Sequence, residues 1–170
     1  VAVIRIAVPY TGMIISTRES QESRRQVLDI GISQISGGSR TSVGGYAEPE
    51  PLSENSAQFD LSDTRTLDEI VGWLLDMGYI PSFCTACYRA GRTGDRFMSL
   101  VKSGQIANCC APNALVTLKE YLEDYASPAT RAKGEELIIR EAGKIPNPKI
   151  KEIALRNVKE IAGGKRDFRF

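Results

Sequence analysis

Residues 83–113 of this 170-residue chain are FCTACYRAGRTGDRFMSLVKSGQIANCCAPN, and they contain all four of its cysteines. Cys84, Cys87 and Cys110 follow the pattern C-x2-C-x22-C, and Cys109 stands directly before the last of them. The sequence contains no histidine. Two thiols three residues apart can face one metal centre when the backbone between them turns, and a third thiol from a later loop completes such a site. The segment therefore predicts a cysteine-ligated metal centre.

The number of thiols limits which kind of metal centre this segment can hold. A structural zinc ion usually takes four protein ligands from cysteine and histidine. Cys109 and Cys110 can both bind one ion only through a strained turn, because adjacent side chains tend to point apart. Three thiolates without a fourth match a 4Fe–4S cluster, which keeps one iron open to a substrate, a free amino acid or another metal fragment.

Other uses of the cysteines stay open on spacing alone. A zinc site that uses all four sulfurs is the main alternative, and inert buried thiols are another, since free cysteine behaves as a small core hydrophobe. A thioredoxin-like redox pair is disfavoured, because no strand-to-helix context surrounds Cys84.

The length and the charge of the chain limit the classes of protein to which it can belong. A chain of 170 residues suits one domain, or a small domain plus a piece of another. The net charge of +1 argues against nucleic acid or a membrane as the main partner, and no apolar run approaches the length of a transmembrane helix. Unpaired cysteines at metal-like spacing favour a reducing, cytoplasmic compartment. Val1 opens within an apolar strand pattern, so we expect a fragment of a longer protein.

The first part of the chain predicts an α/β arrangement with a parallel sheet. Apolar runs indicate strands and a charged amphipathic stretch indicates a helix between them, in the order strand 1–8, short strand 13–15, helix 18–30 and strand 32–36. Two or three strands cannot close a barrel. If the fold is a (β/α)8 TIM-type barrel, only its last strands and helices are present here.

Arg18 and the segment 37–41, which contains Ser39 and Arg40, follow predicted strand ends. In a barrel, the loops at the carboxyl ends of the strands carry the site. An arginine there can hold a carboxylate through two parallel hydrogen bonds. The alternative is that both arginines form ordinary surface or interdomain salt bridges.

A helical region follows a linker. Residues 43–56 are rich in Gly, Pro, Ser and Glu, which indicates a loop leading off the sheet. Thr66 and Glu69 predict a capping box, and Gly78 is expected to end the helix that this box starts. Further helix starts are predicted at Asp95, Pro112, Ser127-Pro128 and Asn147-Pro148. The basic tail 165–170 either docks on the protein or stays mobile.

Three segments closely resemble the C-terminal part of the HydG family, the radical-SAM tyrosine lyases that mature FeFe-hydrogenase. These segments are GYIPSFCTACYR at 78–89, GRTGDRFM at 91–98 and CAPNA at 110–114. The resemblance implies that residues 1–45 are the end of the radical-SAM barrel, 46–62 a linker and 63–170 a helical domain. It also implies that Cys84, Cys87 and Cys110 hold an auxiliary 4Fe–4S cluster. By the same resemblance, Cys109 occupies a place where an aromatic residue is expected, so we do not expect it to be a ligand.

The resemblance also implies an activity for the complete protein. S-adenosylmethionine and an N-terminal 4Fe–4S cluster would start cleavage of L-tyrosine to p-cresol and dehydroglycine, and the auxiliary cluster would help form carbon monoxide and cyanide on iron. In that family this end of the barrel lies over S-adenosylmethionine and tyrosine, which makes Arg18, Ser39 and Arg40 candidates for substrate binding. Expected partners are the other hydrogenase maturation proteins, with no nucleic acid and no membrane.

Two features depart from that family pattern. The radical-cluster motif C-x3-C-x2-C and the histidine that holds an extra iron are both absent from these 170 residues, so we expect them upstream of Val1. One alternative is a 2-iminoacetate synthase-type tyrosine lyase of thiamine synthesis, which C-x2-C-x22-C disfavours. Another is a non-catalytic helical module stapled by zinc.

Overall fold

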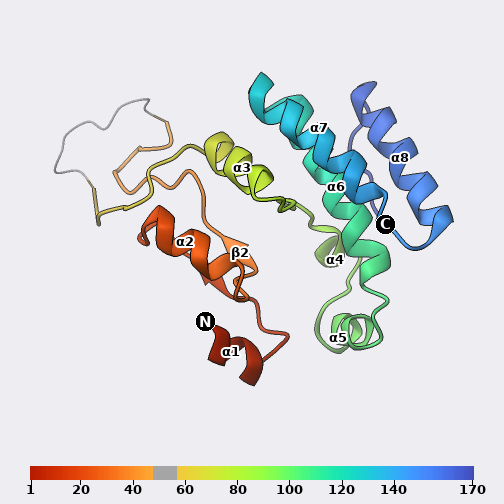
Figure 1. Ribbon diagram of the computed structural model, residues 1–170, viewed down its shortest axis with the longest axis horizontal. Helices are drawn as coiled ribbons and strands as arrows, with labels where there is room; N and C mark the ends of the chain where they lie inside the picture. The colour runs from red at the N-terminus through yellow and green to blue at the C-terminus, as the bar shows by residue number, and fades with distance from the viewer. Residues whose placement is uncertain (48–56) are drawn as a thin grey trace. The chain divides into compact units, whose positions relative to one another are not determined.

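The computed structural model describes residues 1–47 and 57–170, which form two compact units, Val1–Ile70 and Val71–Phe170 (Figure 1). The part of the predicted linker at 48–56 lies outside the described residues. The described chain is mostly helical, and its only described sheet has two strands. The predicted domain boundaries at 45 and 62 stay predictions, as does the barrel, because two strands do not close one.

The first unit contains the expected strand–helix–strand crossover. Its elements are α1 (Ala2–Ala7), β1 (Ile14–Ile15), α2 (Gln21–Leu28) and β2 (Gln34–Ile35). The two strands are parallel, with Ile14 opposite Gln34 and Ile15 opposite Ile35. Helix α2 begins after Ser20, whose hydroxyl accepts a hydrogen bond from the Ser23 N–H. The parallel pairing predicted from the apolar runs is therefore confirmed.

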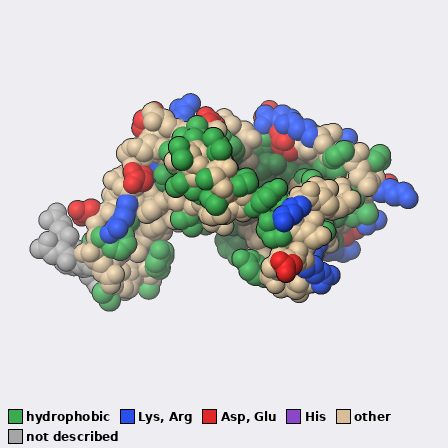
Figure 2. Space-filling model, turned by 90° about the horizontal axis from the view of Figure 1, so that it is seen from below, with side chains coloured by type: hydrophobic (Ala, Val, Ile, Leu, Met, Phe, Trp, Pro, Cys, Tyr) green, Lys and Arg blue, Asp and Glu red, His purple; other side chains and the backbone are tan. Residues whose placement is uncertain are grey.

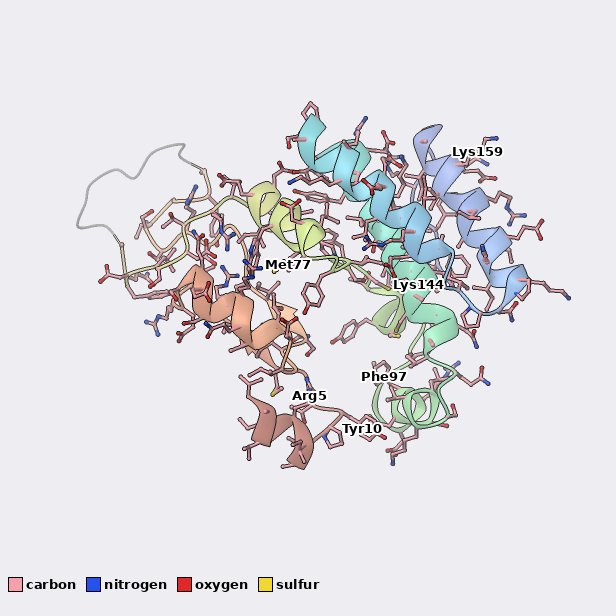
Figure 3. The ribbon with its side chains drawn as sticks, viewed as in Figure 1. Arg5, Tyr10, Met77, Phe97, Lys144 and Lys159 are labelled. Atoms are coloured by element: carbon pink, nitrogen blue, oxygen red, sulfur yellow. The ribbon has the colours of Figure 1, made fainter. Side chains whose placement is uncertain are left out.

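The strand predicted at residues 1–8 is wrong, because this segment forms α1, in which no residue is buried. A strand satisfies its backbone N–H and C=O groups only beside another strand, whereas a helix satisfies them internally. Among the described residues, no strand pairs with this segment. Arg5, labelled in Figure 3, ties α1 to the chain beyond it by donating to the carbonyls of Pro9, Thr11 and Gly31.

A buried ion pair between Arg24 and Asp63 holds the first unit together, and both side chains are 0% exposed. Arg24 comes from α2 and also donates to the carbonyl of Ser36, directly after β2. Arg65 adds a second cation, with its Nε 2.9 Å from Asp63 Oδ1. The Asp63 N–H donates to the carbonyl of Thr17, which follows β1. Arg24 and Asp63 together therefore connect the helix to the chain that follows both strands.

The charges around Asp63 set its pKa. Burial alone raises the pKa of Asp63, but hydrogen bonds from Arg65 and the charges of Arg24 and Arg65 bring it below the ordinary value. A lowered carboxyl pKa stabilises the fold fully above the pKa of a free aspartate, about 4. That contribution is lost as the pH falls through the lower value of the folded state.

Replacing Asp63 with alanine is expected to lower the free energy of unfolding by about 3–5 kcal/mol, because it leaves Arg24 buried without its counter-ion. Urea denaturation of the chain measures the change. Asp76→Ala is the control, since Asp76 pairs with Lys133 at the surface, and an exposed pair contributes at most about 1 kcal/mol. Equal losses in the two variants would contradict a structural role for the buried pair.

The second unit is a helical assembly around α6. Its elements, with α3 beginning in the first unit, are α3 (Leu67–Asp76), α4 (Ala86–Arg89), α5 (Gly94–Lys102), α6 (Ala107–Asp124), α7 (Pro128–Ala142) and α8 (Pro148–Ala162). Helix α6 packs against both α7 and α8 (Figure 1). The core between them is apolar and includes Leu115, Leu118, Leu122, Leu137, Ile138 and Ala154.

Several predicted helix signals are confirmed. The Glu69 carboxylate accepts from the Thr66 N–H at 2.7 Å, and the Glu69 N–H donates back to Thr66 Oγ1 at 3.2 Å. Ser127 and Asn147 cap α7 and α8, and each of these helices begins with a proline. Gly78 has a φ of +81°, a left-handed conformation that suits glycine just after a helix.

The helix start predicted at Pro112 is wrong, because α6 begins at Ala107 and Pro112 lies inside it. The first turn forms upstream, where the N–H groups of Cys109 and Cys110 both donate to the Ile106 carbonyl, at 3.0 and 2.8 Å. Pro112 then removes only one hydrogen bond near the helix start. Cys109 and Cys110 therefore lie on one helical turn, about 100° apart around the axis.

The surface carries charges of both signs. On the face shown in Figure 2, basic and acidic side chains are interspersed with hydrophobic and neutral ones. This mixture agrees with the net charge of +1. Across residues 1–47 and 57–170, no helix is both long enough and apolar enough to cross a membrane.

Candidate metal centre

Three of the four cysteines border one cavity in the second unit. Its volume is about 410 Å³. The residues that line it come from the segment before α4, from α4, from the loop between α4 and α5, from α5 and from the first turn of α6. They are Ser82, Cys84, Cys87, Tyr88, Arg92, Thr93, Gly94, Phe97 and Cys110. Phe97, on α5, is labelled in Figure 3. Cys84, Cys87 and Cys110 therefore share one cavity, whose described lining does not include Cys109. Their role as ligands stays a prediction.

The backbone turns between the first two cysteines, as two thiols three residues apart require. Cys84 precedes α4, and Cys87 lies in that helix. The Ala86 N–H donates to the Cys84 sulfur at 3.4 Å, and the Arg92 N–H donates to the Cys87 carbonyl at 2.8 Å. These two hydrogen bonds fix the backbone turn that brings the two cysteines to one cavity.

Helix α6 anchors this turn from outside the cavity. The Phe83 ring stacks on Tyr121 with the ring centroids 5.0 Å apart. The Phe83 N–H also donates to Thr117 Oγ1 at 3.3 Å. Cys110 lies on the same helix, so α6 holds the segment with the first two thiols and carries the third.

The thiols repel one another once they ionise. Partial burial raises the pKa of the Cys110 thiol, although the residue keeps exposed surface, and the nearby Cys87, Cys84 and Cys109 raise it further. Arg92 acts in the opposite direction and lowers it. Three thiolates are therefore costly to gather without a compensating cation, which a metal centre supplies.

The three cysteines at the cavity suit the spread of ligands that a cluster requires. Among the described residues, no three cysteine, aspartate or glutamate side chains converge on one ion position. A cluster requires less convergence, because each of its thiolates binds a different iron. Arg92 Nε is buried and has no hydrogen-bond partner in the described chain, and such a donor is costly without an acceptor. An anionic cluster with sulfide acceptors would provide one.

The three proposed substrate-binding residues lie in the first unit. Arg18 follows β1, and Ser39 and Arg40 follow β2, so all three come after the carboxyl ends of paired parallel strands. The Arg18 guanidinium lies 4.2 Å from the centre of the Phe59 ring, and the Arg40 N–H donates to the Tyr46 hydroxyl. Within the described ranges neither guanidinium forms an ion pair, and their binding roles stay predictions.

The sequence did not decide where the C-terminal tail lies. In the structure it docks beside the cysteine segment, where Asp167 pairs with Arg89 on α4. The Phe170 N–H donates to Asn113 Oδ1 at 3.1 Å, and the Phe170 side chain packs against the helical core. The only sequence signal was the mixture of basic and aromatic residues, which does not identify these partners.

Comparison with known protein families gives a match in the first part of the chain. The family model of the Biotin and Thiamin Synthesis associated domain matches residues 1–80. The chain thus combines a match to this associated domain with a downstream cavity lined by three cysteines. No curated protein matches the chain.

Solved structures of HydG are similar to the chain. A crystal structure of HydG, a maturase of the FeFe-hydrogenase, matches with a TM-score of 0.91 and 52% identity over 99% of this chain and 36% of that one. HydG from Carboxydothermus hydrogenoformans matches with a TM-score of 0.65 and 36% identity, over 92% of this chain and 32% of that one. The chain spans about a third of these relatives, and its resemblance to HydG is confirmed.

The adjacent cysteines provide a matched pair of variants for ligand assignment. Cys110→Ser is expected to lose most of the iron and sulfide of the reconstituted protein, because it removes one of three thiolates. Cys109→Ser is expected to keep both, since Cys109 does not line the cavity. Iron and acid-labile sulfide analysis measures the difference. The reverse result would show that the adjacent thiol is the ligand.

Proposed function

We propose that this chain is the part of a radical-SAM tyrosine lyase that holds an auxiliary 4Fe–4S cluster and acts in maturation of FeFe-hydrogenase. The observation that carries the proposal is the cavity shared by Cys84, Cys87 and Cys110. It lies in a chain that matches a segment of HydG at 52% identity over 99% of its length.

The protein's own residues have distinct roles in this proposal. Cys84, Cys87 and Cys110 would hold the cluster, and Arg92 would offset part of its negative charge. The group, when bound, supplies an iron without a protein ligand, at which a small molecule can bind. Helix α6 keeps the three thiols at one cavity, because it carries one and anchors the segment with the other two.

The complete protein would act on L-tyrosine in two stages. Cleavage between Cα and Cβ, started by S-adenosylmethionine at an upstream 4Fe–4S cluster, would yield p-cresol and dehydroglycine. The second stage would form carbon monoxide and cyanide on iron and would require the cysteine cavity. Other hydrogenase maturation proteins would be the partners.

Arg18, Ser39 and Arg40 are the candidates for substrate contact in this part of the protein. Their positions after the carboxyl ends of β1 and β2 are those at which barrel enzymes bind their substrates. The guanidinium groups suit the carboxylates of tyrosine or S-adenosylmethionine, and the Ser39 hydroxyl can donate or accept.

The alternative from another functional class is a non-catalytic helical module held together by a zinc ion. The four cysteines of the chain could supply the four ligands of such an ion. A thiamine-pathway tyrosine lyase is the enzymatic alternative, but it offers no use for three thiols around a cavity. An ultraviolet–visible spectrum with metal analysis separates cluster from zinc, since an iron–sulfur protein is brown and a zinc protein is colourless.

The two stages are expected to be separable in the complete protein. Cys84→Ala combined with Cys87→Ala should still release p-cresol, because tyrosine cleavage depends on the upstream cluster. The same variant should give no infrared bands from iron carbonyl or iron cyanide. Chromatography of p-cresol and infrared spectroscopy measure the two outcomes.

Either of two results would contradict this division. Loss of p-cresol from a folded variant that retains the upstream cluster would show that the two stages are not separable. Survival of the iron-bound products would show that the cysteine site is structural, and the zinc alternative would then be favoured.

The 170-residue chain alone is expected to be inactive toward S-adenosylmethionine, because it lacks the C-x3-C-x2-C motif. The test is an assay for 5′-deoxyadenosine after iron–sulfur reconstitution and addition of a strong reductant. Formation of 5′-deoxyadenosine above a blank without protein would contradict the assignment of the radical chemistry to an upstream cluster.

A further inference from the structure

Arg92 joins three features of the second unit. Its Nη1 donates to the Cys109 sulfur at 3.3 Å, and its Nη2 donates to the Phe170 carbonyl at 2.8 Å. The same residue lines the cavity with Cys84, Cys87 and Cys110. Its Nε is buried and has no partner within the described residues. One guanidinium therefore contacts the start of α6 and the C-terminal tail at the edge of the cavity.

The tail that Arg92 contacts is held by specific polar interactions. Asp167 pairs with Arg89, and its N–H donates to Glu120 Oε1 at 2.7 Å. Arg166 Nε donates to Asp124 Oδ2 at 2.9 Å. Asp167 has a φ of +69°, which non-glycine residues adopt only when the surroundings require it. The tail therefore has a defined position against α4 and α6.

The last residue of the tail completes the connection to α6. The Phe170 N–H donates to Asn113 Oδ1 at 3.1 Å, and Asn113 Nδ2 donates back to the Phe170 carbonyl at 3.4 Å. Asn113 is only 2% exposed, so water does not readily replace these bonds. The Phe170 carbonyl thus accepts from both Arg92 and α6.

We propose that Arg92 is a positioning residue that ties the C-terminal tail to the cysteine cavity and places a fixed positive charge beside the centre bound there. The inference rests on the proposed auxiliary cluster. Guanidinium suits this role because it is planar, always charged and rich in donors, so it can hold two acceptors while a third nitrogen stays available. Lysine would keep the charge but lose this geometry.

The charge has a measurable consequence. Reduction adds negative charge to a thiolate-bound cluster, and a nearby cation stabilises the reduced form. Arg92→Gln should therefore shift the reduction potential of the auxiliary cluster to a more negative value. It should also free the tail, because the Phe170 carbonyl loses a charged donor.

The experiment uses the complete protein with three single variants, Arg92→Gln, Arg92→Lys and Arg96→Gln. Arg96 is the matched control, because it is an exposed arginine on the nearby α5 that does not line the cavity. Redox titration with electron paramagnetic resonance measures the potential. The auxiliary signal is the one that Cys84→Ala combined with Cys87→Ala removes. Hydrogen exchange of residues 165–170 measures tail docking, and circular dichroism verifies folding.

The expected results distinguish the effect of the positive charge of Arg92 from the effect of its hydrogen-bond geometry. Arg92→Gln shifts the potential downward, speeds tail exchange, and loses iron to a chelator about tenfold faster. Arg92→Lys keeps the potential near that of the unmodified protein but speeds tail exchange. Arg96→Gln changes neither the potential nor the exchange.

Three results would overturn the inference. Unchanged potential and exchange in Arg92→Gln, with the cluster still bound, would reject Arg92 while leaving the proposed function intact. Equal shifts of potential in Arg92→Gln and Arg96→Gln would show that the shift comes from the overall charge of the protein and not from the position of Arg92. Absence of any iron–sulfur signal dependent on Cys84 and Cys87 in the unmodified protein would reject the proposed function and this inference with it.

Discussion

The packing of α6 against α7 and α8 is the constraint on which the second unit depends. The buried leucines of α6 fix the helix in the core, and its other contacts hold the segment before α4 and the C-terminal tail. Its first turn presents Cys110, the Tyr121 ring holds the segment before α4, and Asn113 receives the tail. The three thiols can keep their places at the cavity because α6 carries Cys110 and holds the segment that carries the other two.

The first unit depends on a different kind of interaction. Its sheet pairs only two residues from each strand, which buries little apolar surface. The Arg24–Asp63 pair compensates by joining α2, the end of β2 and the chain beyond β1. A fully buried ion pair is costly to break but specific in geometry, so it fixes the segment that leads to α3. The candidate substrate residues Arg18 and Arg40 lie in the loops that follow the two strands.

Local signals predicted much of the helical fold. Thr66 with Glu69, Ser127 with Pro128 and Asn147 with Pro148 satisfy free N–H groups within a few residues, so their effect does not depend on distant packing. Two local signals led to wrong predictions. The apolar run at 1–8 indicates a strand, yet no described strand pairs with it. Pro112 resembles a helix start, but burial in the core outweighs its single missing hydrogen bond.

By itself, the sequence determined the four cysteines, their spacing, the absence of histidine and the resemblance to HydG, and these define the candidate centre. Only the tertiary structure decided that Cys84, Cys87 and Cys110 share a cavity, that Arg92 lies at its edge and that the tail docks beside it. The physical reason is separation along the chain. Capping and turn formation act over three or four residues, whereas Arg92 and Phe170 meet only after α6, α7 and α8 have packed.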